Sequence, residues 1–151
     1  MDVTEIAEVP NDSPFPDGMI GVAYADGASR GNPGPAAWGC VYTTEDGEPL
    51  CGEAGTLGET TNNVAEYRGC IAAISRLKAW GVQRAVLRLD SELVVKQING
   101  QYKVRQPHLK PLVQEAQDLR KGFVELRIEH VPRAENRIAD ALANAALDGQ
   151  R

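Results

Sequence analysis

The order of the predicted secondary-structure elements is the feature that most constrains the fold. Strand-like apolar runs come first, at 19–25, 38–43 and 50–57, and the Asp-Gly pair between the second and third is a hairpin signal. Helical spacing follows and then alternates with two further strand-like runs, near 85–89 and 123–131. Antiparallel neighbours followed by strand and helix units favour an α/β fold with one mixed sheet and helices on its faces.

Length and composition are typical of a single domain. The chain has 151 residues, of which 42% are apolar. Residues 1–18 are rich in acidic residues and proline, so we expect a mobile acidic leader that does not pack, before a folded domain at 19–148. No apolar stretch approaches the roughly 20 residues of a membrane helix, and the start lacks a signal-peptide pattern. We therefore expect a cytoplasmic monomer without membrane partners.

Four acidic residues stand where a charge is hard to explain by solvation. Asp26 and Asp90 each follow an apolar strand-like run, at the sheet edge where open α/β sheets bind ligands. Glu66 and Asp140 lie beside the apolar stripes of two predicted helices. Each alone could be a turn residue, a helix cap or a solvated carboxylate. Together they would repel one another unless a cation neutralised them, and an all-oxygen set favours Mg²⁺ or Mn²⁺ over zinc.

Four segments, in their order along the chain, resemble the type 1 ribonuclease H family. They are DGASRGNPGP at 26–35, TTNNVAE at 60–66, DSE at 90–92 and ENRIAD at 135–140. The resemblance covers nearly all the chain after the leader. It implies a ribonuclease H-like fold with a five-stranded mixed sheet in the order 3-2-1-4-5, flanked by helices. It also implies that the catalytic residues, holding two Mg²⁺ or Mn²⁺ ions, are Asp26, Glu66, Asp90 and Asp140.

The function implied by the resemblance is hydrolysis of the RNA strand of RNA/DNA hybrids by a metal-dependent endonuclease, leaving 5′-phosphate and 3′-hydroxyl ends. Two alternatives stay open: a broadened ribonuclease that also cuts double-stranded RNA, and a non-catalytic domain that binds hybrids. A net charge of -5 argues against binding by bulk electrostatics, although carboxylates committed to divalent cations would no longer repel phosphate. The residues carried over as substrate contacts are Gly27, Asn32, Thr61, Asn62, Asn63 and Glu92. Residues 60–63 could instead only cap the helix.

Two departures from the family concern the substrate and the last loop. Residues 101–111 contain only three cations and no tryptophan, so the basic protrusion of many members is missing. Glu92 stands where many members have Gln. For the mobile histidine that many members place before the last helix, the candidates are His130 and Arg133. We favour Arg133, because strand alternation makes His130 a structural residue. An arginine could hold a phosphate but could hardly act as a base.

Overall fold

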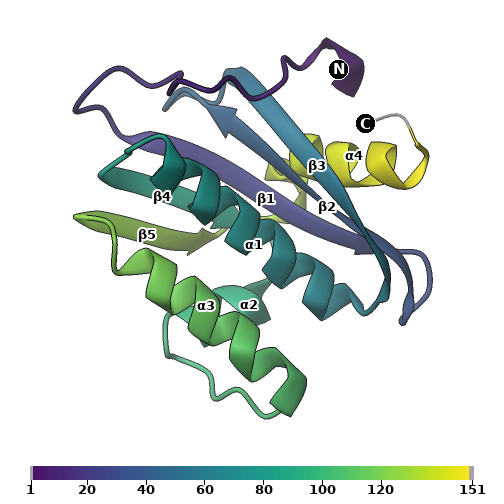
Figure 1. The fold of residues 1–151 in the computed structure, drawn as a ribbon. Helices are drawn as coiled ribbons and strands as arrows, with labels where there is room; N and C mark the ends of the chain where they lie inside the picture. The colour runs from purple at the N-terminus through teal and green to yellow at the C-terminus, as the bar shows by residue number, and fades with distance from the viewer. Residues whose placement is uncertain (1, 150–151) are drawn as a thin grey trace.

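The protein forms one five-stranded sheet in a computed structural model that describes residues 2–149 (Figure 1). The order is β3-β2-β1-β4-β5, which confirms the expected fold. β2 pairs antiparallel with β1 and β3, whereas β4 pairs parallel with β1 and β5. The strands are β1 (Gly21–Ser29), β2 (Gly34–Thr43), β3 (Pro49–Thr60), β4 (Arg84–Leu89) and β5 (Glu125–His130).

Helices cover both faces of the sheet. α1 packs against β1 and β2 and against α3, while α4 packs on β1, β2 and β3. Ala23 and Ala25 of β1 lie in the core with α1, and Tyr24 between them packs against the cluster of α4, since successive strand side chains point to opposite faces. The helices are α1 (Asn62–Ala79), α2 (Glu92–Ile98), α3 (Lys110–Arg120) and α4 (Arg137–Leu147).

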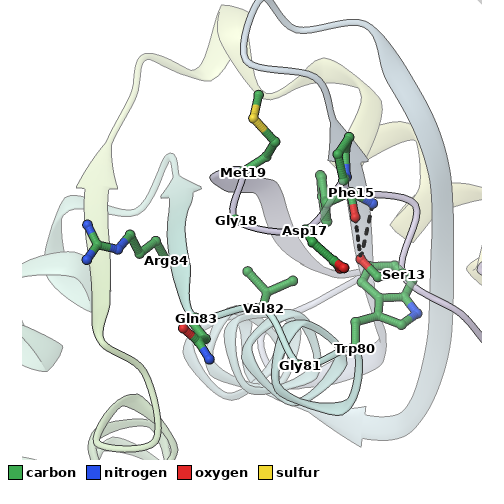
Figure 2. Close-up of a pocket in the computed structure, with 11 residues that line it drawn as sticks. Ser13, Phe15, Asp17, Gly18, Met19, Trp80, Gly81, Val82, Gln83 and Arg84 are labelled. Carbon is green, nitrogen blue, oxygen red and sulfur yellow. Dashed lines mark hydrogen bonds between the residues drawn. The ribbon is translucent and has the colours of Figure 1, made fainter.

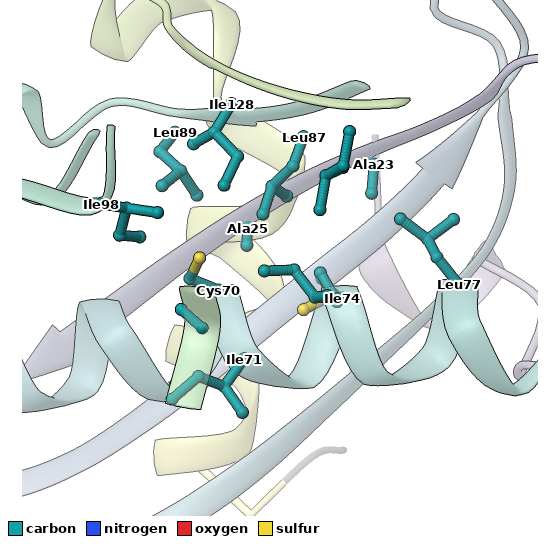
Figure 3. Packing of buried hydrophobic residues seen from close by; sticks show 14 of the residues in the cluster. Ala23, Ala25, Cys70, Ile71, Ile74, Leu77, Leu87, Leu89, Ile98 and Ile128 are labelled. Atoms are coloured by element: carbon teal, nitrogen blue, oxygen red, sulfur yellow. The ribbon is translucent and has the colours of Figure 1, made fainter. Parts of the chain in front are cut away.

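The sequence explains the bounds and the packing of α1. Thr61 caps the helix, because its side chain accepts a hydrogen bond from the Val64 amide at 3.3 Å. Gly81, at a φ of 75°, follows its end. Ile74 and Leu77 are fully buried and face the sheet, opposite the small side chains of β1 (Figure 3). This packing fixes α1 across the centre of the sheet.

β1 is longer than the sequence predicted. Its pairing with β4 ends at Ala25, opposite Leu89, but its pairing with β2 continues to Ser29. Asp26 therefore does not end the strand. It is the first residue of β1 beyond the parallel pairing, and Asp90 is the first residue after β4. Both carboxylates still start from the same edge of the sheet.

The leader packs against the domain, which differs from the expectation that it would not. It begins with a short 3₁₀ helix, Val3–Glu5. Ile6 is buried, and the Ala7 carbonyl accepts a hydrogen bond from Gly52 of β3 at 2.9 Å. Further along, Phe15 is 8% exposed, and its ring packs against that of Trp80 in a T-shaped arrangement with centroids 6.0 Å apart (Figure 2). Two apolar side chains thus hold an otherwise acidic segment.

Replacing Phe15 by alanine should destabilise the protein by about 3 kcal/mol, because it removes a buried ring and leaves a cavity. The expected fall in melting temperature is roughly 6 to 12 °C for a chain of this size. Differential scanning calorimetry measures it, with Glu5→Ala as the control, since Glu5 is an exposed residue of the same segment. A melting temperature equal to that of the wild type would mean that the leader does not pack in solution.

Candidate active site

The four predicted carboxylates line one open pocket of about 490 Å³. Asp26 comes from β1 and Asp90 follows the end of β4, whereas Glu66 comes from the second turn of α1 and Asp140 from the first turn of α4. The parallel edge of the sheet and two helix starts therefore meet at this pocket. Its other lining residues are Gly27, Ala28, Ser29, Asn62, Asn63, Ser91, Arg133 and Asn144.

Three of the carboxylates converge closely enough to share a cation. One oxygen from each of Asp26, Glu66 and Asp90 lies within 4.8 Å of the others. Asp140 lines the same pocket but does not belong to this group of three. The structure thus brings all four predicted residues to one place, with Asp140 at the side of the group of three.

Burial makes this cluster unfavourable without a counter-charge. Asp26 is 4% exposed, and burial is the main cause that raises the pKa of its carboxyl group, with repulsion from Glu66 next. Burial also raises the pKa of Glu66, while a hydrogen bond with Asp26 acts in the opposite direction. Charged carboxylates at this spacing need either a proton or a cation.

One atom of the cluster indicates a cation. The Glu66 Oε2 atom is buried and has no hydrogen-bond partner among residues 2–149. Buried acceptors are nearly always paired, and a missing ion is one explanation for an exception. The donor set consists only of carboxylate oxygens, which suits a hard divalent cation. The residues present therefore fit a divalent metal site.

Gly27 allows α1 to approach β1 closely. A side-chain carbon at this position would lie 2.2 Å from the Ala65 carbonyl carbon and 2.3 Å from the Glu66 nitrogen. The Gly27 amide donates a hydrogen bond to Asp26 Oδ1 at 2.9 Å. Gly27 was predicted as a substrate contact, which stays a prediction, and what the structure shows is that its missing side chain lets the strand of Asp26 lie close to the helix of Glu66.

Gly39 allows α4 to approach β2 in the same way, although its sequence pattern did not mark it as part of the site. Gly39 is the β2 partner of Asp26. A side-chain carbon here would lie 2.4 Å from the Ala139 carbonyl oxygen and 2.6 Å from the Ala143 nitrogen. The helix that carries Asp140 therefore rests directly on the β2 backbone. Its sequence signal was only a glycine inside a strand, which can mark a close backbone approach.

The polar residues predicted as substrate contacts surround the start of α1. Asn62 and Asn63 line the pocket. Thr61 is the cap of α1, so the capping interpretation is correct for this residue. Asn32 accepts a hydrogen bond from the Asn62 amide at 3.0 Å, and Ser29 donates one to the Asn62 side chain at 2.6 Å. The loop after β1 is thereby tied to the amide groups of the helix start.

The remaining predicted residues differ in their distance from the carboxylates. Arg133 lines the pocket, whereas His130 is the exposed last residue of β5 and does not. Glu92 is exposed and turned to its own helix and the following loop, where it accepts hydrogen bonds from Lys96 Nζ at 2.7 Å and from the Tyr102 hydroxyl at 3.4 Å. The geometry thus favours Arg133 over His130 as a neighbour of the acidic cluster.

A second pocket lies at the opposite end of the parallel strands, and none of the four carboxylates lines it. Its volume is about 230 Å³, and it lies between the leader, the end of α1 and the start of β4 (Figure 2). Asp17 and Arg84 are the charged residues of its lining. It has no group of carboxylates that could hold a metal, so the acidic pocket remains the candidate active site.

The fold and the acidic cluster define the class: a ribonuclease H-like α/β domain with a carboxylate cluster that fits a divalent metal at the carboxyl edge of its parallel strands. The family described as reverse transcriptase-like matches residues 24–146. Ribonuclease HI of Halobacterium salinarum is 48% identical over 126 residues, covering 83% of this chain and 63% of the relative. The chain belongs to the ribonuclease H family.

Other relatives define the extent of the match. A bifunctional protein of Mycobacterium tuberculosis is 47% identical over 128 residues, but the match spans 84% of this chain and only 35% of that protein. The crystal structure of the H. salinarum ribonuclease H1 superposes with a TM-score of 0.83 at 46% identity, covering 87% of this chain and 99% of the other. LC11 ribonuclease H1 in complex with an RNA/DNA hybrid gives a TM-score of 0.80 at 41% identity, covering 85% of this chain and 97% of the other.

Among the helices of residues 2–149, none is long and apolar enough to span a bilayer.

Proposed function

We propose that this chain is an endonuclease that hydrolyses the RNA strand of RNA/DNA hybrids, leaving 5′-phosphate and 3′-hydroxyl ends. The observation that carries the proposal is the approach of Asp26, Glu66 and Asp90 within 4.8 Å, in a domain of the ribonuclease H family. Support for the substrate comes from relatives named ribonuclease H and from the hybrid bound to LC11 ribonuclease H1. We place the enzyme in the cytoplasm as a monomer.

The four carboxylates would hold two Mg²⁺ or Mn²⁺ ions. When bound, such ions activate a water for attack on the scissile phosphorus and stabilise the leaving 3′ oxygen. The contribution of the protein is to hold the four carboxylates in fixed positions. Asp26 and Asp90 start from the sheet edge and Glu66 and Asp140 from helices held on either face, so the ligands are fixed before substrate arrives. Arg133 at the pocket wall provides a cation that can hold a phosphate.

Substrate recognition falls to the start of α1 and to the loop tied to it. The amino end of α1 carries a partial positive charge that favours a phosphate group nearby. Asn62 and Asn63 are short polar side chains that suit the wide, shallow minor groove of an A-like hybrid, where 2′-hydroxyls identify the RNA strand. Residues 101–106 contain no helix in this structure. The grip on the DNA strand is therefore weaker than a basic protrusion would give, and double-stranded RNA is the competing substrate to test.

The test is cleavage of a labelled 20-base-pair hybrid by purified protein with Mg²⁺, with Mn²⁺ and with a chelator. We expect cleavage of the RNA strand with either metal, none with the chelator, and intact duplex DNA. A parallel digest of an RNA duplex decides whether the substrate range is broader. If the protein binds the hybrid but leaves it intact with both metals, the chain is a hybrid-binding domain and not an enzyme.

A further inference from the structure

We propose that Asn136 and Asn144 are positioning residues that fix the Asp140 carboxylate relative to Asp26. The proposal rests on the proposed function of the acidic pocket. Asn136 immediately precedes α4, and Asp140 and Asn144 follow at intervals of four residues, so the three lie in one row along the helix. One asparagine lies a turn before Asp140 and the other a turn after it.

Asn136 ties the start of α4 to the strand that carries Asp26. Its Nδ2 donates a hydrogen bond to the Ala25 carbonyl at 2.9 Å, and its own backbone carbonyl accepts one from the Asp140 amide at 3.2 Å. Ala25 immediately precedes Asp26 and is paired with Leu89, which immediately precedes Asp90. The bond therefore joins the turn of Asp140 to the sheet position from which both aspartates project.

The Oδ1 atom of Asn136 indicates that stability alone does not explain why an asparagine stands at this position. Asn136 is 1% exposed, and its Oδ1 has no hydrogen-bond partner among the described residues. Since the Ala25 carbonyl can only accept, the amide must turn its nitrogen there and leave the oxygen unpaired. The side chain also makes no cap hydrogen bond, which is the usual task of asparagine at a helix start. The hydrogen bond to the Ala25 carbonyl, beside Asp26, therefore leaves the buried Oδ1 atom of Asn136 without a partner among the described residues.

Asn144 acts on the other side of Asp140. Its Nδ2 donates to the Asp140 backbone carbonyl at 3.0 Å and to Asp140 Oδ1 at 3.3 Å. The residue also lines the acidic pocket. A neutral amide donor restricts the orientation of the carboxylate without adding a positive charge that would compete with a cation. Hydrogen bonds of this kind to metal-binding carboxylates orient them and affect metal affinity.

The test measures Mn²⁺ binding by calorimetry together with steady-state kinetics for Asn136→Ala and Asn144→Ala. We expect each variant to bind Mn²⁺ about tenfold more weakly or worse and to lose kcat by a similar factor, with KM for the hybrid nearly unchanged. The matched control is Asn99→Ala, because Asn99 also donates to a strand carbonyl, that of Ile128 at 3.0 Å, outside the acidic pocket. It should lower the melting temperature and leave Mn²⁺ affinity and kcat unchanged.

A double-mutant cycle shows whether the effect passes through Asp140. In an Asp140→Asn background, adding Asn144→Ala should cause no further loss of Mn²⁺ affinity. Wild-type Mn²⁺ affinity in both asparagine variants, or an undiminished loss in the Asp140→Asn background, would overturn the proposal. If Asn136→Ala does not fold, Asn144→Ala alone decides. If the wild type binds Mn²⁺ but does not cut hybrids, the proposed function fails while the binding data still test the positioning.

Discussion

Asp26→Asn is expected to make the metal-free protein more stable and to reduce hybrid cleavage by about a thousandfold or more. Metal ions contribute several kcal/mol to catalysis, and each 1.4 kcal/mol corresponds to roughly tenfold in rate. The same substitution keeps the size of the side chain but removes a carboxyl group that burial and the neighbouring Glu66 and Asp90 force either to take up a proton or to carry an unfavourable charge. The melting temperature at pH 8 with a chelator should rise by about 2 to 4 °C for each kcal/mol of repulsion relieved.

The raised pKa values of the cluster also predict how the stability of the metal-free protein changes with pH. The folded-state pKa values of Asp26 and Glu66 lie above their ordinary values of 3.8 and 4.5, because burial disfavours the charged forms. Between the ordinary and raised values the folded state binds more protons than the unfolded state, so this contribution to stability is full below about pH 4 and is lost as the pH rises. In wild-type protein without metal, thermal melts should show this loss.

The matched control for both measurements is Asp12→Asn, since Asp12 is an exposed carboxylate of the leader. This variant should follow the wild type in cleavage and in its melting temperature across the pH range. Asp26→Asn should lose less stability than the wild type between pH 5 and 8. If Asp26→Asn melted below the wild type at pH 8 with a chelator, the cluster would not carry the repulsion that its burial implies.

Glu66 and Asp140 were predicted from their places beside the apolar stripes of helices and from the family resemblance of their segments, whereas Asp26 and Asp90 follow from simple geometry. Parallel strands end at one edge of a sheet, so carboxylates placed just after apolar runs must meet there. The extension of β1 past Asp26 was not predictable in the same way. The stretch after Asp26 is rich in turn-forming residues, but Gly27 to Ser29 have a partner strand in β2, and pairing there outweighs local preference.

The supporting contacts could not be predicted, because each depends on atoms that only the fold brings together. Asn136 and Ala25 are 111 positions apart in the sequence, and nothing in the sequence indicates that the asparagine side chain binds the alanine carbonyl. The leader was misjudged because its acidic and proline-rich composition hides two apolar residues, Ile6 and Phe15, that are buried in the domain. Composition describes a segment on average, whereas packing depends on individual side chains.

The largest effect on both fold and site is expected from Gly27→Ala. Its new methyl group would lie 2.2 Å from a backbone carbon of Ala65, a distance that no side-chain rotation can relieve. Either β1 or the start of α1 must move, and overpacking of this kind costs about 3 kcal/mol or more. The melting temperature should fall by roughly 6 to 12 °C or more, and cleavage should be lost below that temperature because Glu66 moves with its helix.

Gly122→Ala is the control that distinguishes the steric clash at position 27 from a general effect of replacing glycine by alanine. Gly122 lies after α3, and a side-chain carbon there would lie no closer than 3.3 Å to any atom, the nearest being the flexible Lys78 side chain. Gly122→Ala should therefore be neutral or slightly stabilising, since it reduces the freedom of the unfolded chain. Calorimetry and hybrid cleavage compare the two variants. Full activity in a folded Gly27→Ala protein would show that α1 can move away from β1 without displacing Glu66, and the close contact at Gly27 would then have no part in the geometry of the metal site.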